Sequence, residues 1–239
     1  MIRTTWVVLN VFAATIPFSL LVVIGSYLGA RPRFYDQIPR WWARWILWAT
    51  GVRVRVMGAE NLSADRAQII VANHVSWYDV LALAAYTPKR YRFVAKKELA
   101  RIPLWGHAWL AAGHISVDRS DNQRAVASLD QAGRTILEDN SSVIIFPEGT
   151  RSRTGELQAF KKGAFVLALN NGIDIVPTGV QGTYDIMSRD NWRIRSGRII
   201  VRFGPPVSPV GYDMRQRDEL IARVRSEVAA LLLPAAQYT

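Results

Sequence analysis

The chain has 239 residues, enough for one α/β domain or for a domain with a small appendage. It contains no cysteine, which excludes disulfides, thiolate nucleophiles and cysteine-based metal sites. The net charge of +11, from 30 Lys and Arg against 19 Asp and Glu, favours an anionic partner such as a nucleic acid, a membrane surface or a phosphorylated substrate.

The first segment of the chain is strongly apolar. Residues 4–30 carry no charge, and the stretch Trp6–Leu28 would form a helix of roughly 35 Å, enough to cross a bilayer. A signal peptide is the competing interpretation, but the apolar stretch is long for one and no clear cleavage site follows it. Arg31 and Arg33 after the stretch favour a cytoplasmic C-terminal side. We therefore expect a membrane protein that works at the cytoplasmic face of the inner or plasma membrane.

A second helical pattern follows, rich in tryptophan and arginine. Trp41, Trp45 and Trp48 recur at helical spacing and share one face, as in helices that lie among lipid headgroups. The same periodicity also fits a helix packed on a domain core. We predict that residues 1–50 form a helical pair that binds an anionic membrane surface, and that residues 51–239 form the α/β domain. Whether the first helix spans the bilayer or lies in one leaflet stays open.

From residue 52 onward, short runs rich in Val and Ile alternate with helical patterns. This alternation predicts an α/β fold with a mostly parallel, mixed sheet flanked by helices. The predicted strands cover residues 68–72, 91–95, 114–117, 142–146, 173–176 and 198–203. The predicted helices cover residues 76–86, 103–111, 122–139, 160–170 and 213–233.

A histidine and an aspartate follow the first predicted strand. His74 comes two residues after that strand, where α/β folds place reactive groups, and Asp79 lies five residues later at the start of a helix. That spacing lets the carboxylate accept the Nδ1 hydrogen of the imidazole while Nε2 points outward as a base. There is no Gly-x-Ser-x-Gly elbow, and nothing marks Ser76 as activated. We therefore expect His74 to deprotonate the hydroxyl of an acceptor that attacks a thioester, with a structural histidine as the competing interpretation.

A second motif, Phe-Pro-Glu-Gly-Thr-Arg-Ser at 146–152, again follows a predicted strand. A glycine turn exposes backbone amides, and Arg151 offers a planar fork to a phosphate. Lys96 and Arg119 add positive charge near other strand ends, although a solvated basic face explains some of the lysines. Nucleotide-binding glycine motifs are absent from the sequence. The motif therefore predicts a site for a phosphate-bearing acceptor.

The two other histidines, His107 and His114, have no carboxylate at a useful spacing, and we interpret both as structural. Three dispersed histidines give no pattern of metal ligands, so we expect no metal site.

Four motifs in order resemble the 1-acyl-sn-glycerol-3-phosphate acyltransferase (lysophosphatidic acid acyltransferase) family. The resemblance runs from about Ile69 to Val180, nearly half of the chain. The motifs are Asn73-His74-x4-Asp79, the block from Phe93 to Arg119, the block from Phe146 to Ser152, and Val176-Pro177-Thr178-Gly179-Val180.

The resemblance implies transfer of a fatty acyl group from acyl-CoA or acyl-carrier protein to the sn-2 hydroxyl of lysophosphatidic acid, giving phosphatidic acid. It implies no cofactor beyond the acyl donor, and a membrane-bound N-terminal helix pair. In its terms His74 is the base and Asp79 orients it. The acceptor and its phosphate are held by Glu148, Gly149, Thr150, Arg151, Lys96 and Arg119.

Three other functions stay open. The same fold and chemistry serve other acceptors, such as a lyso-ornithine lipid or another lysophospholipid. A lipase or esterase is a second alternative, against which the missing nucleophile elbow argues. A basic protein without enzymatic activity, bound to nucleic acid or membrane, is the third. The tryptophan-rich helices do not suit nucleic acid, so we expect no nucleic-acid partner.

Overall fold

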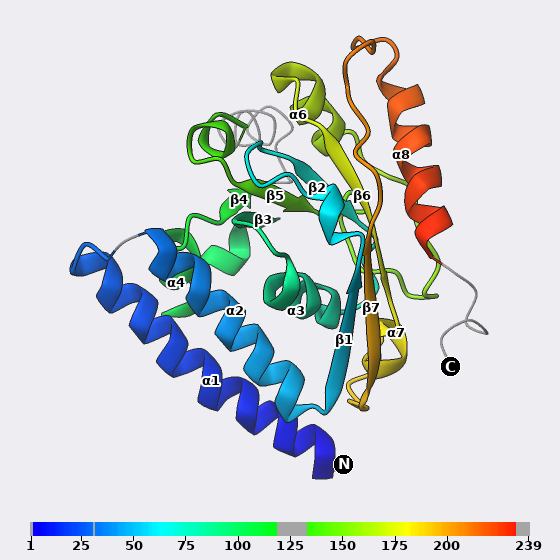
Figure 1. Ribbon diagram of the computed structural model, residues 1–239. Coiled ribbons are helices and arrows are strands. Elements are labelled where there is room, and N and C mark those ends of the chain that lie inside the picture. The colour runs from blue at the N-terminus through cyan, green and yellow to red at the C-terminus, as the bar shows by residue number, and fades with distance from the viewer. Residues whose placement is uncertain (1, 31, 119–132, 233–239) are drawn as a thin grey trace.

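The computed structural model describes residues 2–30, 32–118 and 133–232 (Figure 1). The arginine at 119 and most of the predicted helix 122–139 lie outside these residues; residues 133–138 are helical. The helices are α1 (Ile2–Tyr27), α2 (Pro32–Ala49), α3 (Trp77–Tyr86), α4 (Trp105–Ala111), α6 (Gly163–Asn171), α7 (Thr183–Ile186) and α8 (Arg217–Leu231). The strands are β1 (Val52–Met57), β2 (Ile69–Ala72), β3 (Tyr91–Lys96), β4 (Ile115–Val117), β5 (Ser142–Ile145), β6 (Ile175–Gln181) and β7 (Gly197–Phe203), with 3-10 turns at Ala59–Asn61 and Lys97–Arg101.

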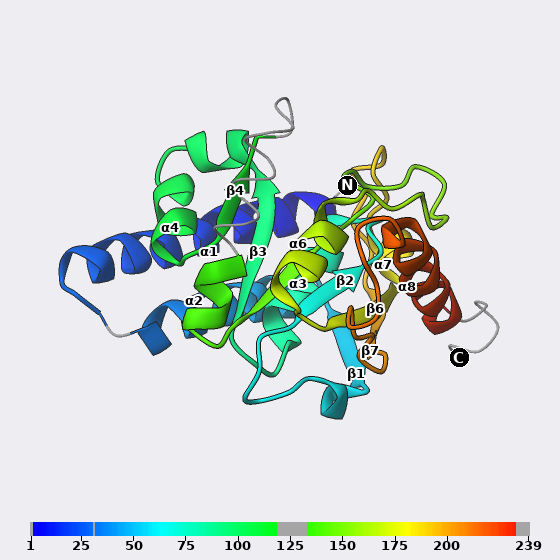
Figure 2. The same cartoon turned by 90° about the horizontal axis from the view of Figure 1, so that it is seen from above.

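The strands form one seven-stranded sheet in the order β1-β7-β6-β2-β5-β3-β4. Neighbouring strands run parallel, except that β6 and β7 are antiparallel. Helices cover both faces: α2 and α3 lie on one, and α6 and α8 on the other (Figures 1 and 2). The predicted α/β fold with a mostly parallel, mixed sheet is confirmed.

The central strand β2 shows why the inner strands of this sheet have continuous apolar sequences. Ile70 and Ala72 belong to the core beneath α2 and α3, whereas Ile69 and Val71 belong to the core beneath α6 and α8. All four side chains are fully buried, since helices cover the sheet on both sides.

The sheet register brings the two predicted motifs together. Val71 of β2 pairs with Ile145 of β5, and both strands end within a residue of this pair. The segments after them, 73–79 and 146–152, therefore leave the sheet at the same edge. In open α/β sheets, this carboxyl edge is where ligands bind.

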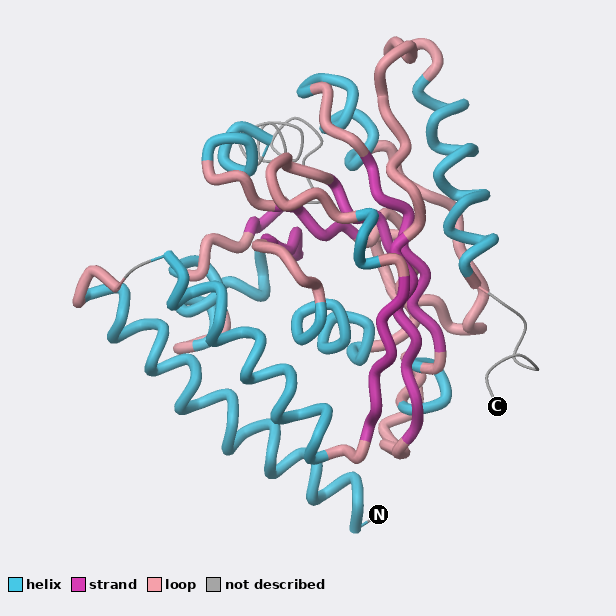
Figure 3. The backbone as a smooth tube through the Cα atoms, viewed as in Figure 1, coloured by secondary structure: helices cyan, strands magenta, loops and turns pink. Residues whose placement is uncertain are grey.

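Two differences from the predicted strands have physical causes. The strand prediction omits β1, which the backbone tube shows as a strand (Figure 3). Its Val52, Val54 and Val56 face the core and the intervening arginines are exposed, so the segment contains no continuous apolar run. The strand predicted at 173–176 starts at Ile175 and continues to Gln181. Pro177 lies inside it, and the ladder to β7 begins only at Thr178, so the missing proline N–H breaks no hydrogen bond of that ladder.

The N-terminal helices pack side by side against the rest of the molecule. Helix α1 has 26 residues and contains an 18-residue window with a mean hydropathy of 2.4, so it is long and apolar enough to cross a membrane by length and composition. Ala43, Ile46 and Leu47 of α2 are buried against the core. A second face of α2 is open: Trp41, Trp45 and Trp48 are 50%, 46% and 69% exposed.

One face of α2 is therefore packed on the domain core, and binding of its exposed tryptophan face to lipid headgroups stays a prediction. A groove of about 360 Å³ lies between α1 and α2, lined by Phe18, Arg44 and the three tryptophans. The division into residues 1–50 and 51–239 stays a prediction, because α2 shares its core with the sheet.

Buried polar contacts fix α2 over the start of β3. Asp36 accepts from Arg90 Nε at 2.8 Å and from Arg92 Nη1 at 2.9 Å. Arg40 donates to the carbonyls of Thr87 and Lys89, and its guanidinium lies 5.0 Å from the Tyr91 ring. These bonds tie the second helix to the domain by directional contacts as well as by apolar packing.

Candidate active site

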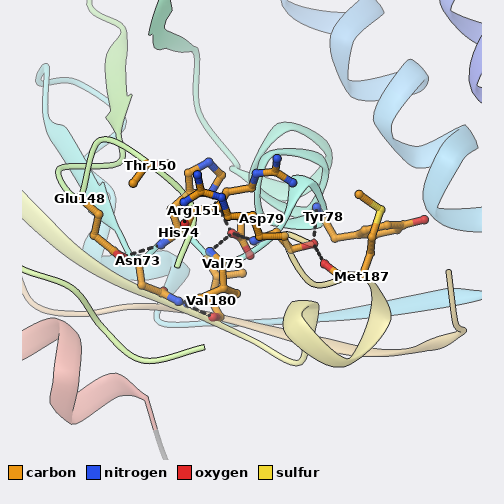
Figure 4. Close-up of polar contacts among 12 residues, drawn as sticks. Asn73, His74, Val75, Tyr78, Asp79, Glu148, Thr150, Arg151, Val180 and Met187 are labelled. Atoms are coloured by element: carbon orange, nitrogen blue, oxygen red, sulfur yellow. Dashed lines mark hydrogen bonds and ion pairs between the residues drawn. The ribbon is translucent and has the colours of Figure 1, made fainter. Parts of the chain in front are cut away.

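A short turn between β2 and α3 carries the predicted base. Asn73 anchors it, because its side chain donates to the Val180 carbonyl at 2.9 Å and accepts from the Val180 amide at 2.8 Å. Ser76 then caps α3, accepting from the Tyr78 amide at 3.2 Å. His74 is thus held between a clamp to β6 and the first turn of a helix (Figure 4).

The predicted pair is in contact. Nδ1 of His74 lies 2.9 Å from Oδ2 of Asp79. The same oxygen accepts from the amides of Val75 at 2.7 Å and Ser76 at 2.8 Å, completing a capping box with the helix N-terminus. Since Oδ2 acts as an acceptor throughout, we assign the hydrogen to Nδ1, which leaves the Nε2 lone pair available as a base.

The second motif grips the backbone and ring of His74. The His74 amide donates to Oε1 of Glu148 at 2.7 Å, and the Ser152 amide donates to the His74 carbonyl at 2.8 Å. The imidazole stacks on Phe146, with ring centres 4.1 Å apart and planes 17° apart. The His74 side chain is 16% exposed and Asp79 is fully buried, so solvent reaches the base but not its partner.

Glu148 has a role that the sequence does not reveal. Its second oxygen, Oε2, accepts from the side chain of Gln158 at 2.9 Å and from the Gln158 amide at 3.3 Å. Burial raises the pKa of Glu148, whereas the hydrogen bonds donated by His74 and Gln158 act in the opposite direction and lower it. Both oxygens are therefore engaged within the protein, and contact of Glu148 with an acceptor stays a prediction.

Gly149 makes the sharp turn of the second motif. Its φ of +74° is the left-handed region, and a Cβ there would lie 2.8 Å from Nζ of Lys161. The glycine thus lets the lysine chain lie across the turn. Thr150, the next residue, is exposed.

Arg151 lies beside His74 and above the start of α3 (Figure 4). Its guanidinium is 5.3 Å from the centre of the half-exposed Trp77 ring. Desolvation lowers the pKa of Arg151, and the charge of Arg189 lowers it further, while Asp79 and Asp190 act in the opposite direction. A desolvated cation next to the base suits an anionic group of a substrate.

Of the two remaining predicted residues, only Lys96 is among the described residues, and it forms no hydrogen bond or ion pair with this group. Lys96 ends β3 at the same edge of the sheet, is exposed, and pairs with Glu98 at 3.4 Å. Arg119 lies outside the described residues. The roles of both in phosphate binding stay predictions.

Ser76 and His114 could be mistaken for reactive groups, but the side chain of each is engaged in a hydrogen bond within the protein. Ser76 is buried and its hydroxyl donates to the Met187 carbonyl at 2.6 Å. His114 accepts from the Phe93 amide at 3.2 Å, and burial lowers its pKa to about 3, with a smaller contribution from Arg92. In the part of the chain that the structure describes, no three His, Cys, Asp or Glu side chains are grouped to hold a metal ion.

The geometry is that of a histidine–aspartate base next to an arginine, with the serine between them committed to capping. Such a site can activate a hydroxyl that a substrate brings with it. The arrangement can therefore support direct transfer of a group to such a hydroxyl.

Comparison with known proteins identifies the family. The acyltransferase family model matches residues 53–181, more than half of the chain. The 1-acyl-sn-glycerol-3-phosphate acyltransferase of Limnanthes douglasii is 35% identical over 192 residues, covering 80% of this chain and 67% of that protein. That of Saccharomyces cerevisiae is 35% identical over 184 residues, covering 76% of this chain and 60% of that protein.

The fold also occurs among solved structures. One of them is the 1-acyl-sn-glycerophosphate (LPA) acyltransferase PlsC from Thermotoga maritima, with a TM-score of 0.80 and 23% identity over 98% of this chain and 97% of that one. The chain belongs to the acyltransferase family and, within it, to the 1-acyl-sn-glycerol-3-phosphate acyltransferases.

Proposed function

We propose that this protein transfers a fatty acyl group from a thioester donor, acyl-CoA or acyl-carrier protein, to the sn-2 hydroxyl of lysophosphatidic acid. The observation that carries the proposal is the 2.9 Å contact between His74 and a buried Asp79 beside Arg151. Relatives that carry the name 1-acyl-sn-glycerol-3-phosphate acyltransferase support this acceptor.

The proposed reaction proceeds in one displacement through a tetrahedral intermediate. Nε2 of His74 takes the proton of the acceptor hydroxyl as its oxygen bonds to the acyl carbon. Asp79, hydrogen-bonded to Nδ1, stabilises the imidazolium that forms. The carbon–sulfur bond then breaks, and the imidazolium returns its proton to the departing thiolate. No acyl-enzyme forms, because the attacking oxygen belongs to the acceptor.

We further propose that the protein works on the cytoplasmic face of a membrane, bound through α1 and α2. The apolar α1 and the exposed tryptophan face of α2 support this placement. An anionic surface would attract a chain of net charge +11. Both substrates of the proposed reaction carry fatty acyl chains, so a membrane-bound site would receive one of them from the bilayer.

The test is thiol release from acyl-CoA, and in parallel from acyl-carrier protein, by protein reconstituted in vesicles. Three conditions are compared: lysophosphatidic acid, a lyso-ornithine lipid and no acceptor. Each is repeated with His74→Ala and with His107→Ala, an exposed histidine that serves as the control.

The proposal expects release that requires lysophosphatidic acid and His74 and that His107→Ala leaves unchanged. Release without an acceptor would indicate a thioesterase. Activity with the lyso-ornithine lipid alone would keep the chemistry and change the acceptor. Silence with every donor and acceptor would support a protein without enzymatic activity.

A further inference from the structure

The segment after β6 braces both halves of the candidate site. It comprises α7 and the four residues that follow, 187–190, and lies between the start of α3 and the 146–152 motif. Three hydrogen bonds hold it: Ser76 Oγ to the Met187 carbonyl at 2.6 Å, Tyr184 OH to the Arg153 carbonyl at 2.9 Å, and Arg189 Nη1 to the Arg151 carbonyl at 2.7 Å.

These bonds place a second arginine next to the first. Arg189 reaches the main chain of Arg151, so its position is fixed relative to that residue and not only to its own loop. The two charges are close enough for Arg189 to lower the pKa of Arg151. Both arginines are only partly exposed, which limits screening of one guanidinium from the other by solvent.

The nearby carboxylates form no direct ion pair with either arginine. Asp190, the next residue, pairs with Arg153 at 3.5 Å. Oδ2 of Asp79 accepts three hydrogen bonds at the start of α3. Among the described residues, neither Arg151 nor Arg189 has a carboxylate oxygen within 4.0 Å. Two partly buried guanidinium groups that form no direct ion pair repel each other, and an anion bound to both would reduce that repulsion.

We propose that Arg189 and Arg151 together form a two-arginine site for the phosphate of the acceptor. This inference rests on the proposed function and adds a binding residue to it. A phosphate monoester carries more than one negative charge near neutral pH, and planar forks bind its oxygens in pairs. The Ser152–His74 hydrogen bond ties this phosphate site to the base, so a phosphate held there would fix the distance of the hydroxyl from Nε2.

The proposal separates binding from chemistry. Arg189 touches neither His74 nor Asp79 in the structure's hydrogen bonds, so its loss should weaken the acceptor and spare the chemical step. Removing one charged contact to a phosphate typically costs a factor of roughly 10–100 in affinity. The binding of an acceptor without a phosphate should not be altered by the loss of Arg189.

The experiment compares Arg189→Ala, Arg189→Lys and Arg193→Ala. Arg193 lies in the same connection and is exposed, so its variant is the control for charge and loop position. Steady-state kinetics use lysophosphatidic acid and the matched 1-acylglycerol, which lacks the phosphate. Glycerol 3-phosphate serves as a competing inhibitor, and thermal unfolding in detergent checks each fold.

We expect Arg189→Ala to raise the KM for lysophosphatidic acid and the inhibition constant of glycerol 3-phosphate roughly 10–100-fold. kcat, the donor KM and the activity on 1-acylglycerol should stay within about threefold. Arg189→Lys should recover part of the binding, and Arg193→Ala should behave like the wild type.

Two results would overturn the inference. One is an unchanged acceptor KM in Arg189→Ala. The other is an equal loss with both acceptors, which would assign Arg189 a purely structural role in holding the Arg151 main chain. A wild-type protein inactive on lysophosphatidic acid would refute the proposed function instead, so the two failures are distinguishable.

Discussion

Replacing Asp79 by Asn tests how the buried carboxylate supports the base. Oδ2 accepts three hydrogen bonds, whereas Oδ1 is buried and has no hydrogen-bond partner among the described residues. An asparagine can keep its oxygen at the Oδ2 position and put its NH2 group at the Oδ1 position. The tautomer and the capping box of α3 are then retained, and the change removes mainly the negative charge.

The size of the effect follows from the contact. With Nδ1 and Oδ2 2.9 Å apart, the charges of an imidazolium and a carboxylate are centred about 4 Å from each other. At an effective dielectric constant of about 20, their attraction is about 4 kcal/mol. If the transition state carries most of the imidazolium charge, its loss lowers kcat about 10³-fold. The buried NH2 adds a stability cost of about 1–3 kcal/mol.

The assay is kcat and KM for both substrates, with unfolding of each variant monitored in detergent. Asp185→Asn, at an exposed carboxylate of α7, is the matched control. We expect an unchanged acceptor KM and a large fall in kcat for Asp79→Asn only. A folded Asp79→Asn protein that keeps more than about a tenth of the wild-type kcat would refute electrostatic support of His74.

Three further predictions concern two buried side chains, His114 and Arg40, and the turn at Gly149. Burial keeps His114 uncharged, with a pKa of about 3 against 6.5 in the unfolded chain, so its contribution to stability is full above pH 6.5 and is lost as the pH falls toward 3. Between pH 7.5 and 5 the wild type should lose about 2 kcal/mol of unfolding free energy that His114→Phe does not lose. The control His107→Phe should behave like the wild type, and an equal loss in the wild type and His114→Phe would contradict the prediction. Arg40→Met leaves the carbonyls of Thr87 and Lys89 without their donor and should lower the free energy of chemical unfolding by about 2–4 kcal/mol. The control Arg53→Met, at an exposed position, should lower it by less than about 0.5 kcal/mol. Similar losses in the two variants would show that Arg40 does not anchor α2. Gly149→Ala and Gly172→Ala both place a Cβ at positive φ and should each cost about 1–2 kcal/mol of unfolding free energy. Only the Cβ at 149 would displace a neighbour, Lys161, and only this turn belongs to the motif predicted to hold the acceptor, so only Gly149→Ala should raise the acceptor KM. A change in both variants or in neither would contradict a role of the turn at Gly149 in acceptor binding.

The sequence predicts the dyad because its determinants are local. His74 lies two residues after β2 and Asp79 lies in the first turn of α3, so spacing alone brings them together. The contacts of Glu148 and Arg189 could not be read in this way. Each reaches a main-chain atom that is distant along the sequence, and only the pairing of β2 with β5 and β6 brings these segments together.

The strands also differ in how well the sequence predicts them. Strands buried on both faces, such as β2 and β5, are visible as apolar runs. The edge strand β1 has no continuous apolar run, because every second residue is exposed, and is missed when strands are sought as such runs. Strand β6 is predicted too short because Pro177 and Gly179 weaken its pattern. The tryptophan helix shows a third case, since its periodicity is correct but cannot say which face is buried.

The most direct measurement of the central claim is a mass balance with acyl-CoA and lysophosphatidic acid. Phosphatidic acid, released CoA and the intact mass of the protein are determined in one reaction, with and without acceptor. Direct transfer predicts one phosphatidic acid, acylated at sn-2, for each CoA released, and a protein mass that stays unmodified without acceptor. An acyl adduct on the protein, or CoA released without phosphatidic acid, would contradict it.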